Sequence, residues 1–320
     1  GDNTASELPI DYERPEDFLR DADTAMYRAK ALGKGRFVIF DRNMHASALA
    51  RLELETDLRR AVHSLRNSPP EFIAYYQPIL SLQTGKLAGF EALLRWQHPT
   101  KGLVSPAKFI PLAEETGLIV PLGTWILKEA VQQLRKWQKA FPQHCPLTMS
   151  VNLSGKQIRE PDLIDQIDRI LAKTGLESQS LKLEITESIL MDNADAATEM
   201  LLALRSRHIQ LSIDDFGTGY SSLSYLHRFP VNTLKIDRSF VKRMQPNGSN
   251  SEIVRAIVSL AHNLGMDVIA EGIEVGMQLQ HLKALGCEYG QGYFYAPPLS
   301  QEVIEQNWLQ CDPIIHNDCA

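Results

Sequence analysis

The chain has 320 residues, of which 44% are hydrophobic and 22% are charged, and its formal net charge is −6. This balance is typical of a globular protein and argues against a largely disordered chain. The negative charge excludes a globally basic surface of the kind that binds a nucleic-acid polymer, so a phosphate ligand would need local cations or bound metal.

The sequence carries no signal for a membrane span or for secretion. Its longest apolar stretch, residues 118–127, contains Pro121 and Gly123 and is far shorter than the roughly 20 residues that a span needs. Residues 1–6 are polar, unlike the apolar core of a signal peptide. The four cysteines form no CxxC pair, which favours a reduced protein. We therefore expect a cytoplasmic chain, although a full-length protein could be anchored upstream.

Residues 1–42 resemble the end of a larger domain. A helical pattern begins at Pro15 and ends at Gly33 and Gly35, and the apolar run 37–40 predicts a strand. One helix and one strand cannot bury a core by themselves, so we expect the body of this domain to lie outside the sequence. A second helical pattern, 45–66, is followed by Asn-Ser-Pro-Pro, and we assign residues 43–70 to a linker helix.

From residue 71 onward, strand-like and helix-like segments alternate. The strand-like runs are 72–77, 87–96, 147–153, 181–186, 209–216, 233–240, 267–272 and 288–294, and the helical patterns are 121–140, 162–173, 194–207, 251–264 and 275–285. This alternation predicts an α/β fold, most simply a (β/α)8 TIM-like barrel over residues 71–320. The first two runs are joined by a short connection that contains Gly85, so we expect one strand to be antiparallel.

Polar residues occupy one parity of the predicted strands. Leu211 and Ile213, for example, alternate with Ser212 and Asp214. A period of two places each polar set on a single face, which we infer to be the barrel interior. The last polar residue of each run should then reach the C-terminal mouth of the barrel. The residues in this position are Glu91, Asn152, Glu184, Asp214, Asp215, Asp237, Glu271 and Gln291.

A ring of six carboxylates predicts a metal site. Clustered anions repel one another and would in part protonate, whereas a divalent cation removes the conflict. Oxygen ligands favour Mg²⁺ or Mn²⁺ over Zn²⁺. The adjacent Asp214 and Asp215 can serve two nearby metals, which together activate a water and stabilise the leaving oxygen of a phosphodiester. Lys235 supplies a cation inside the ring that could hold the water or neutralise transition-state charge.

Individual members of this set also have structural interpretations. The two adjacent aspartates could cap a helix, Lys235 could be a structural ion-pair partner, and Gln291 could be a turn residue between two glycines. The shared parity of the set favours a metal site, because independent caps have no reason to share it.

Seven motifs follow one another in the barrel region. They are Glu91-Ala-Leu-Leu-Arg-Trp96, Val151-Asn-Leu-Ser154, Leu183-Glu-Ile-Thr-Glu187, Asp214-Asp-Phe-Gly-Thr-Gly-Tyr-Ser-Ser222, Leu234-Lys-Ile-Asp237, Ala270-Glu-Gly-Ile-Glu274 and Gly290-Gln-Gly292. Together they resemble the EAL-domain phosphodiesterases, which linearise cyclic di-GMP to pGpG. Every motif position matches active members of that family, which favours an enzyme.

The resemblance implies a role for each residue. Two Mg²⁺ or Mn²⁺ ions would be held by Glu91, Asn152, Glu184, Asp214, Asp215, Asp237 and Glu271, with Asp215 and Asp237 nearer the second ion. Lys235 would orient the water, and Glu271 is also a candidate base. Gln77 and Arg95 would hold the substrate, with Gln291 positioning the water beside it. Glu187 would anchor a lid loop at residues 218–222, and Glu274 would support the site.

The N-terminal piece resembles a second family. Asp21-Ala-Asp-Thr-Ala-Met-Tyr-Arg-Ala-Lys30 and Gly33-Lys-Gly-Arg36 are similar to the end of a GGDEF (diguanylate cyclase) domain, without its signature loop. This implies a longer GGDEF–EAL protein with sensor domains upstream, and a homodimer through the barrel is a further expectation. Two alternatives stay open: a receptor that binds cyclic di-GMP without turnover, and a signalling scaffold with a silent pocket.

Overall fold

The computed structural model describes residues 14–31, 37–65, 70–192, 194–218, 226–244 and 249–310. The chain divides into two compact units, Gly1–His63 and Ser64–Ala320. In the first unit, helix α1 (Pro15–Ala31) contacts helix α2 (Arg42–His63). Within the described residues, no helix is both long enough and apolar enough to cross a membrane.

The predicted strand at residues 37–40 is wrong. These residues have no regular secondary structure, and Phe37 and Ile39 are 85% and 78% exposed. A strand is held by hydrogen bonds to a neighbouring strand, and the described part of the first unit contains no such neighbour.

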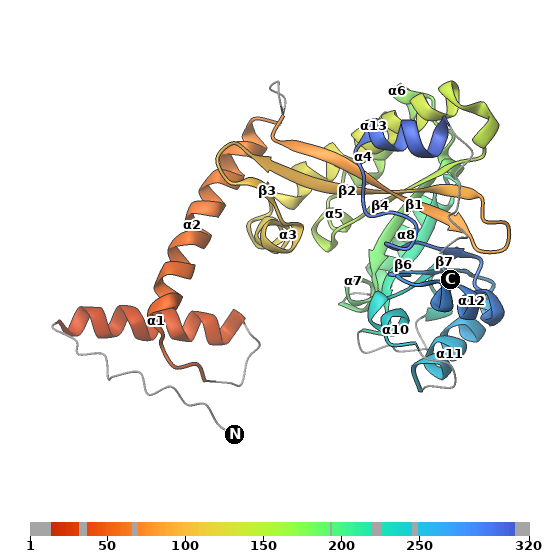
Figure 1. Cartoon of the computed structure of the whole chain (residues 1–320). Helices are drawn as coiled ribbons and strands as arrows, with labels where there is room; N and C mark the ends of the chain where they lie inside the picture. Colours follow the sequence, from red (N-terminus) through yellow and green to blue (C-terminus); the bar gives the residue numbers. More distant parts are fainter. Residues whose placement is uncertain are drawn as a thin grey trace. The chain divides into compact units, whose positions relative to one another are not determined.

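Eight strands of the second unit close into a barrel (Figure 1). They are β1 (Phe72–Ser81), β2 (Leu87–His98), β4 (Thr148–Asn152), β5 (Leu181–Thr186), β6 (Gln210–Phe216), β7 (Thr233–Ile236), β8 (Asp267–Ala270) and β9 (Tyr289–Gly290). Strand β1 runs antiparallel to both of its neighbours, β2 and β9, and the remaining neighbours around the ring are parallel. The predicted α/β barrel with one antiparallel strand is confirmed. The short strand β3 (Gly102–Val104) pairs with β2 outside the ring.

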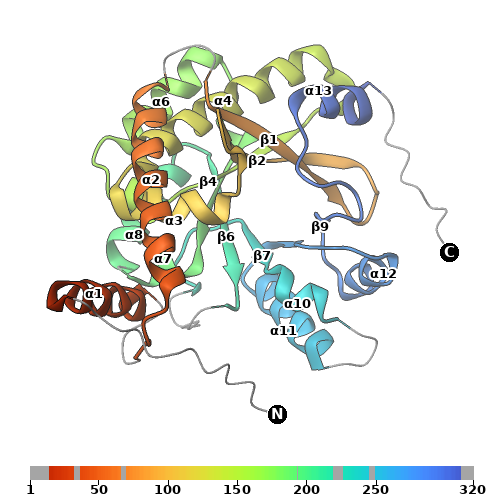
Figure 2. The same ribbon diagram turned by 60° about the vertical axis from the view of Figure 1, so that its left-hand side comes forward.

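Helices surround the barrel and its mouth, as Figure 2 shows from a second direction. They are α3 (Pro106–Thr116), α4 (Ile119–Ala140), α5 (Gly155–Ile158), α6 (Leu163–Thr174), α7 (Glu187–Asp192), α8 (Ala194–Arg205), α10 (Arg238–Lys242), α11 (Ser249–Asn263), α12 (Gly276–Leu285) and α13 (Gln301–Ile304). Short 3₁₀ turns lie at Pro142–His144 and Ser178–Ser180, and a π-helical turn lies at Glu305–Leu309.

The apolar parity of the strands packs against these helices. Leu183, Ile185, Leu211 and Ile213 are all at most 1% exposed and belong to one hydrophobic core. Because the apolar parity faces the helices, the polar parity of the same strands faces the barrel axis. The alternation in the sequence thus determines which side chains reach the interior.

Several local structures differ from the sequence prediction. The strand predicted at 288–294 is limited to β9, and the short helices α5, α7, α10 and α13 were not predicted. The strand predicted at 233–240 ends at Ile236, because Asp237 Oδ1 accepts a hydrogen bond from the Ser239 amide and caps α10. Helix α3 was not predicted. It begins with Pro106 in its first turn and ends at Gly117, whose φ of 79° lies in the left-handed region, a pairing of signals that is typical of helix ends.

Candidate active site

Lys235 lies at the centre of a ring of carboxylates at the C-terminal ends of the strands. Its Nζ atom is 2.5 Å from Glu184 Oε2, 2.6 Å from Glu271 Oε1, 3.2 Å from Asp214 Oδ1 and 3.5 Å from Glu91 Oε2. The lysine side chain is 1% exposed. The four acids belong to β2, β5 and β6 and to the residue that follows β8, so barrel closure brings them to one point.

Two side-chain amides tie the ring together. Asn152 Nδ2 donates to Glu91 Oε1 at 2.8 Å, and Gln291 Nε2 donates to Glu91 Oε2 at 2.7 Å and to Glu271 Oε1 at 3.1 Å. Both oxygens of Glu91 therefore accept from an amide. Gln291 does more than form a turn, because its side chain reaches from the residue that follows β9 to Glu91 on β2.

The single positive charge of Lys235 does not balance the negative charges of four buried carboxylates. The pKa of Glu184 and of Glu271 is raised to about 8. Burial is the largest cause, and repulsion from the neighbouring acids adds to it, while the positive charge of Lys235 acts in the opposite direction. Burial would also raise the pKa of Glu91, but Lys235 and the two amides hold it below its usual value. Burial opposes the charge of Lys235, yet the four carboxylates raise its pKa well above its ordinary range. The metal-free ring thus retains protons near neutral pH.

The adjacent aspartates reach the site through an irregular backbone. In a regular strand, Asp214 and Asp215 would point to opposite faces. Asp215 has a φ of 54°, in the left-handed region, and the β6–β7 register shifts between Ile213 and Phe216. Oxygens of Asp214, Asp215 and Glu271 lie within 4.8 Å of one another. This all-oxygen donor set fits Mg²⁺ or Mn²⁺.

Asp237 lies beside this group at the end of β7. Burial raises the pKa of Asp215, and the charges of Asp214 and Asp237 raise it further. Asp237 also caps α10 through Oδ1. The capping role that the sequence offered for the paired aspartates is therefore seen at Asp237.

Glu187 and Glu274 differ in their surroundings. Glu187 is 2% exposed, and its Oε2 accepts a hydrogen bond from the Gly217 amide at 3.1 Å. Of the expected lid loop at 218–222, only Thr218 lies within the described residues. The half-exposed Glu274 side chain lies 3.7 Å from Lys242 Nζ, and among the contacts of the described residues it makes none to the carboxylate ring.

The two residues expected to bind substrate lie on the first two strands. Gln77 is opposite Glu91 in the β1–β2 ladder, and its Nε2 donates to the Ala296 carbonyl at 3.1 Å. The guanidinium of Arg95 lies 5.5 Å from the centre of the Tyr75 ring. Burial lowers the pKa of Arg95.

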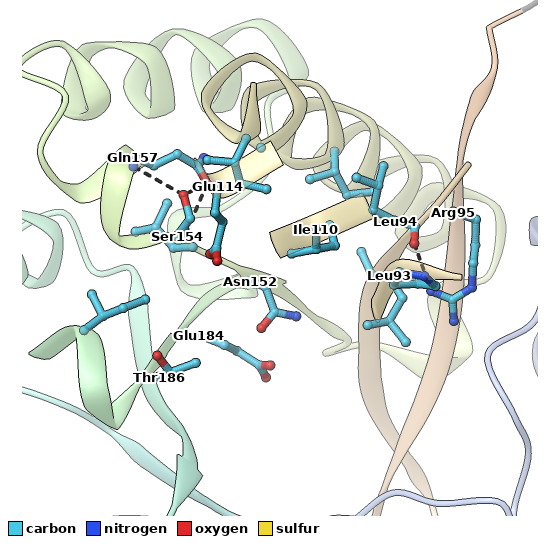
Figure 3. Close-up of a pocket in the computed structure, with 17 residues that line it drawn as sticks. Leu93, Leu94, Arg95, Ile110, Glu114, Asn152, Ser154, Gln157, Glu184 and Thr186 are labelled. Carbon is cyan, nitrogen blue, oxygen red and sulfur yellow. Dashed lines mark hydrogen bonds between the residues drawn. The ribbon is translucent and has the colours of Figure 1, made fainter. Parts of the chain in front are cut away.

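A cavity of about 290 Å³ connects Arg95 with the ring (Figure 3). Its labelled lining residues are Leu93, Leu94, Arg95, Ile110, Glu114, Asn152, Ser154, Gln157, Glu184 and Thr186. Figure 3 shows Asn152 and Glu184 near each other on one wall, with Arg95 on a different strand. The cavity has apolar walls and a few polar groups, which is usual for a site that holds an organic ligand.

Lys182 is a buried cation that the sequence analysis did not place in the site. It lies on the polar parity of β5, where its Nζ donates to Thr233 Oγ1 at 3.1 Å and is 5.9 Å from the centre of the Tyr289 ring. Burial lowers the pKa of Lys182. The strand alternation was the signal that could have identified it, since it shares the interior face with Glu184.

Comparison with known proteins gives consistent results. The EAL domain family matches residues 55–298. The bifunctional diguanylate cyclase/cyclic di-GMP phosphodiesterase MucR of Pseudomonas aeruginosa is 40% identical over 294 residues, which cover 92% of this chain and 42% of MucR. The cyclic di-GMP phosphodiesterase NbdA of the same organism is 40% identical over 298 residues, which cover 93% of this chain and 37% of NbdA. The chain thus spans about two fifths of the length of these relatives.

A solved structure agrees in fold as well as in sequence. The PaMucR phosphodiesterase in complex with c-di-GMP superposes with a TM-score of 0.72 at 41% identity and covers 77% of this chain and 99% of that one. Together with the barrel and the seven ordered motifs, these matches establish that the chain belongs to the EAL domain family.

Proposed function

We propose that this protein hydrolyses cyclic di-GMP to linear pGpG. The observation that carries the proposal is the ring of four carboxylates around Lys235, with Asp215 beside it. The relatives MucR and NbdA, both named as cyclic di-GMP phosphodiesterases, and the c-di-GMP complex of PaMucR support the choice of substrate.

The oxygen-rich mouth of the barrel would hold two Mg²⁺ or Mn²⁺ ions. The residues proposed as ligands are Glu91, Asn152, Glu184, Asp214, Asp215, Asp237 and Glu271, with Asp215 and Asp237 nearer the second ion. Bound divalent ions supply an activated water and stabilisation of the leaving oxygen. The buried Oε1 of Glu184 has no hydrogen-bond partner among the described residues, and its two lone pairs allow it to bind a metal and still accept a hydrogen bond.

Other residues of the chain bind the substrate, accept a proton and hold the carboxylates in position. Arg95 binds a substrate phosphate through its guanidinium, a planar donor that suits phosphate oxygens. Gln77 orients the ligand from β1. Glu271, whose Oε1 lies 2.6 Å from Lys235 Nζ, accepts the proton of the attacking water in its deprotonated form. Lys235 holds this carboxylate and that of Glu184 in place and orients the water, while Gln291 fixes the angle between Glu91 and Glu271.

A turnover assay tests this function. The chain is incubated with cyclic di-GMP and Mg²⁺ or Mn²⁺, and the products are separated by chromatography. We expect pGpG, and we expect EDTA to abolish it. Glu199→Gln, which changes an exposed acid on α8, serves as the control and should match the unmodified chain. Binding without product would instead support the receptor, and no binding by calorimetry, with or without metal, would support the scaffold.

We also propose that residues 1–42 are the end of a GGDEF domain and that the barrel forms a homodimer in the cytoplasm. The motif at residues 21–36 and the share of MucR that this chain covers support the first point. The gene sequence upstream of this segment tests it directly. Sedimentation of the purified chain tests the dimer, and fractionation of cells tests the location.

A further inference from the structure

A second polar layer lies inside the barrel, beneath the carboxylate ring. It consists of four side chains on neighbouring strands: Ser150 on β4, Lys182 on β5, Ser212 on β6 and Thr233 on β7. Each stands two residues before a member of the site, namely Asn152, Glu184, Asp214 and Lys235. With a side-chain period of two, each shares the interior face with that member.

Three oxygens on the neighbouring strands β4, β5 and β6 have no hydrogen-bond partner among the described residues. They are Ser150 Oγ, Ser212 Oγ and Glu184 Oε1, and each of the three residues is 1% exposed. Buried polar atoms are almost always hydrogen-bonded, because leaving one unpaired costs about 1–3 kcal/mol. The Nζ of Lys182 donates to Thr233 Oγ1, and in the described part of the chain it has no second acceptor, so it retains donor capacity.

The strand registers bring these groups together. Ser212 is opposite Glu184 in the β5–β6 ladder and opposite Thr233 in the β6–β7 ladder. Ser150 is opposite Lys182 in the β4–β5 ladder. Neighbouring strands are about 4.8 Å apart, a separation that one water bridges with two hydrogen bonds of about 2.8 Å.

We propose that an enclosed cluster of water in the barrel interior joins Lys182, Ser150 and Ser212 to the free oxygen of Glu184. Only Oε1 of Glu184 is available to it, because Oε2 contacts Lys235. Sites of this kind, with polar groups and two to four partners, are where proteins hold ordered water. The inference rests on the proposed function in one respect, since it takes Glu184 to be a metal ligand.

Such a cluster makes Ser150, Ser212 and Lys182 positioning residues. Groups that hydrogen-bond a metal ligand fix its orientation, and their loss typically weakens metal affinity about 10–100-fold. The alternative is a dry interior, in which each serine hydroxyl donates to a backbone carbonyl of the sheet and has no effect on the orientation of Glu184.

The affinity for Mn²⁺ distinguishes a hydrated barrel interior from a dry one. Mn²⁺ binding to the whole chain is measured by calorimetry for Ser150→Ala, Ser212→Ala, their combination, and Lys182→Met. The control is Ser180→Ala, which removes a buried hydroxyl that accepts from Gln138 Nε2 outside the barrel interior. We expect the double variant to raise the Kd for Mn²⁺ about 10-fold or more, with the control unchanged. Turnover lost at low Mn²⁺ should return at saturating Mn²⁺, which a general loss of folding would not produce.

The outcomes separate this proposal from the proposed function. Unchanged Mn²⁺ affinity in the double variant overturns the positioning role, and so does an unmodified chain that binds no Mn²⁺. A chain that binds Mn²⁺ but yields no pGpG overturns the proposed function and leaves the affinity comparison valid. If the double variant fails to fold, the Mn²⁺ affinities of the single variants are compared with those of the unmodified chain and the control. A high-resolution crystal structure should show water density between Ser212 Oγ and Glu184 Oε1, and a dry layer there overturns the proposal.

Discussion

Glu187 Oε2 accepts a hydrogen bond from the backbone amide of Gly217 at 3.1 Å. This contact joins the residue that follows β5 to the residue that follows β6, two positions beyond Asp215. It fixes the direction in which the chain leaves Asp214 and Asp215, which we propose as metal ligands, and it does so through a carboxylate that is almost fully buried.

The Glu187 contact should matter for turnover through geometry more than through charge. Glu187→Ala removes the acceptor and frees the backbone after Asp215, so we expect kcat to fall at least 10-fold. Glu187→Gln keeps an oxygen that accepts from Gly217 and should retain more activity. Steady-state kinetics of the two variants decide this. Equal losses would show that the negative charge, and not the hydrogen bond, is what the enzyme needs.

Loss of Glu91 should abolish metal binding at the site. Glu91→Gln keeps the size of the side chain but removes the charge and one of the acceptors for Asn152 and Gln291. We expect Mn²⁺ affinity to fall by more than the roughly 10–100-fold that is typical for an outer-shell partner, and pGpG formation to fall with it. Calorimetry with Mn²⁺ is the measurement, and near-normal affinity would refute the ligand assignment.

Lys235 should stabilise the metal-free fold. Lys235→Met leaves four buried carboxylates without their shared cation, and removing one partner of a buried ion pair costs about 3–5 kcal/mol. We expect a lower Tm in EDTA at pH 8 and a partial recovery when Mn²⁺ is added. The exposed Lys242, 3.7 Å from Glu274, provides the control variant Lys242→Met.

Substrate binding should survive in Lys235→Met, with a lower kcat. A collapse of binding would make Lys235 a substrate or structural residue.

The stability of the metal-free protein should fall as pH rises from about 5 to 8. The pKa of Glu184 and of Glu271 is about 8 in the fold, against an ordinary value of 4.5. Between these values the folded state binds more protons than the unfolded state, so the unfolding free energy decreases with pH. The stabilisation from the protons bound to these two carboxyls is complete below about pH 4.5 and is lost above their pKa in the folded state. Thermal unfolding in EDTA and in Mn²⁺ tests this, and a Tm in EDTA that rises over this range would contradict it.

Arg95 should act on substrate binding and not on the chemical step. Its guanidinium lies over the ring of Tyr75 and borders the cavity. Arg95→Lys keeps the charge but loses the planar, bidentate donor. We expect KM to rise about 10-fold or more with kcat nearly unchanged, the pattern of lost uniform binding. A large fall in kcat at saturating substrate would instead place Arg95 at the reacting phosphate.

Strand alternation allowed most of the fold to be predicted. Ser212 and Asp214 alternate with Leu211 and Ile213 because the interior of this barrel is polar and its outer face is covered by helices. The same pattern predicts that Asn152 and Glu184 lie close together, and the two residues are opposite each other in the β4–β5 ladder. The helix α3 was missed although its ends carry clear signals, because its interior contains Pro111, which usually interrupts a helix.

Two features of the structure, one in the site and one in the first unit, could not have been read from the sequence. The left-handed backbone of Asp215 depends on the β6–β7 register shift, and a pattern of period two has no signal for such a shift. The exposure of residues 37–40 has a different cause. An apolar run predicts a strand only where a partner exists, and partners are set by the rest of the fold.

The pairing of β1 with β9 has a consequence during synthesis. Leu80 faces Gly290 in this pair, so the ring cannot close until residue 290 has left the ribosome. At roughly 5–20 residues per second, this delay is on the order of ten seconds or more. During that time the edge of β1 is open to other strands, and Gln291 is not yet available to hold Glu91. A nascent chain that stops short of β9 therefore carries the acids of the site without being able to assemble it.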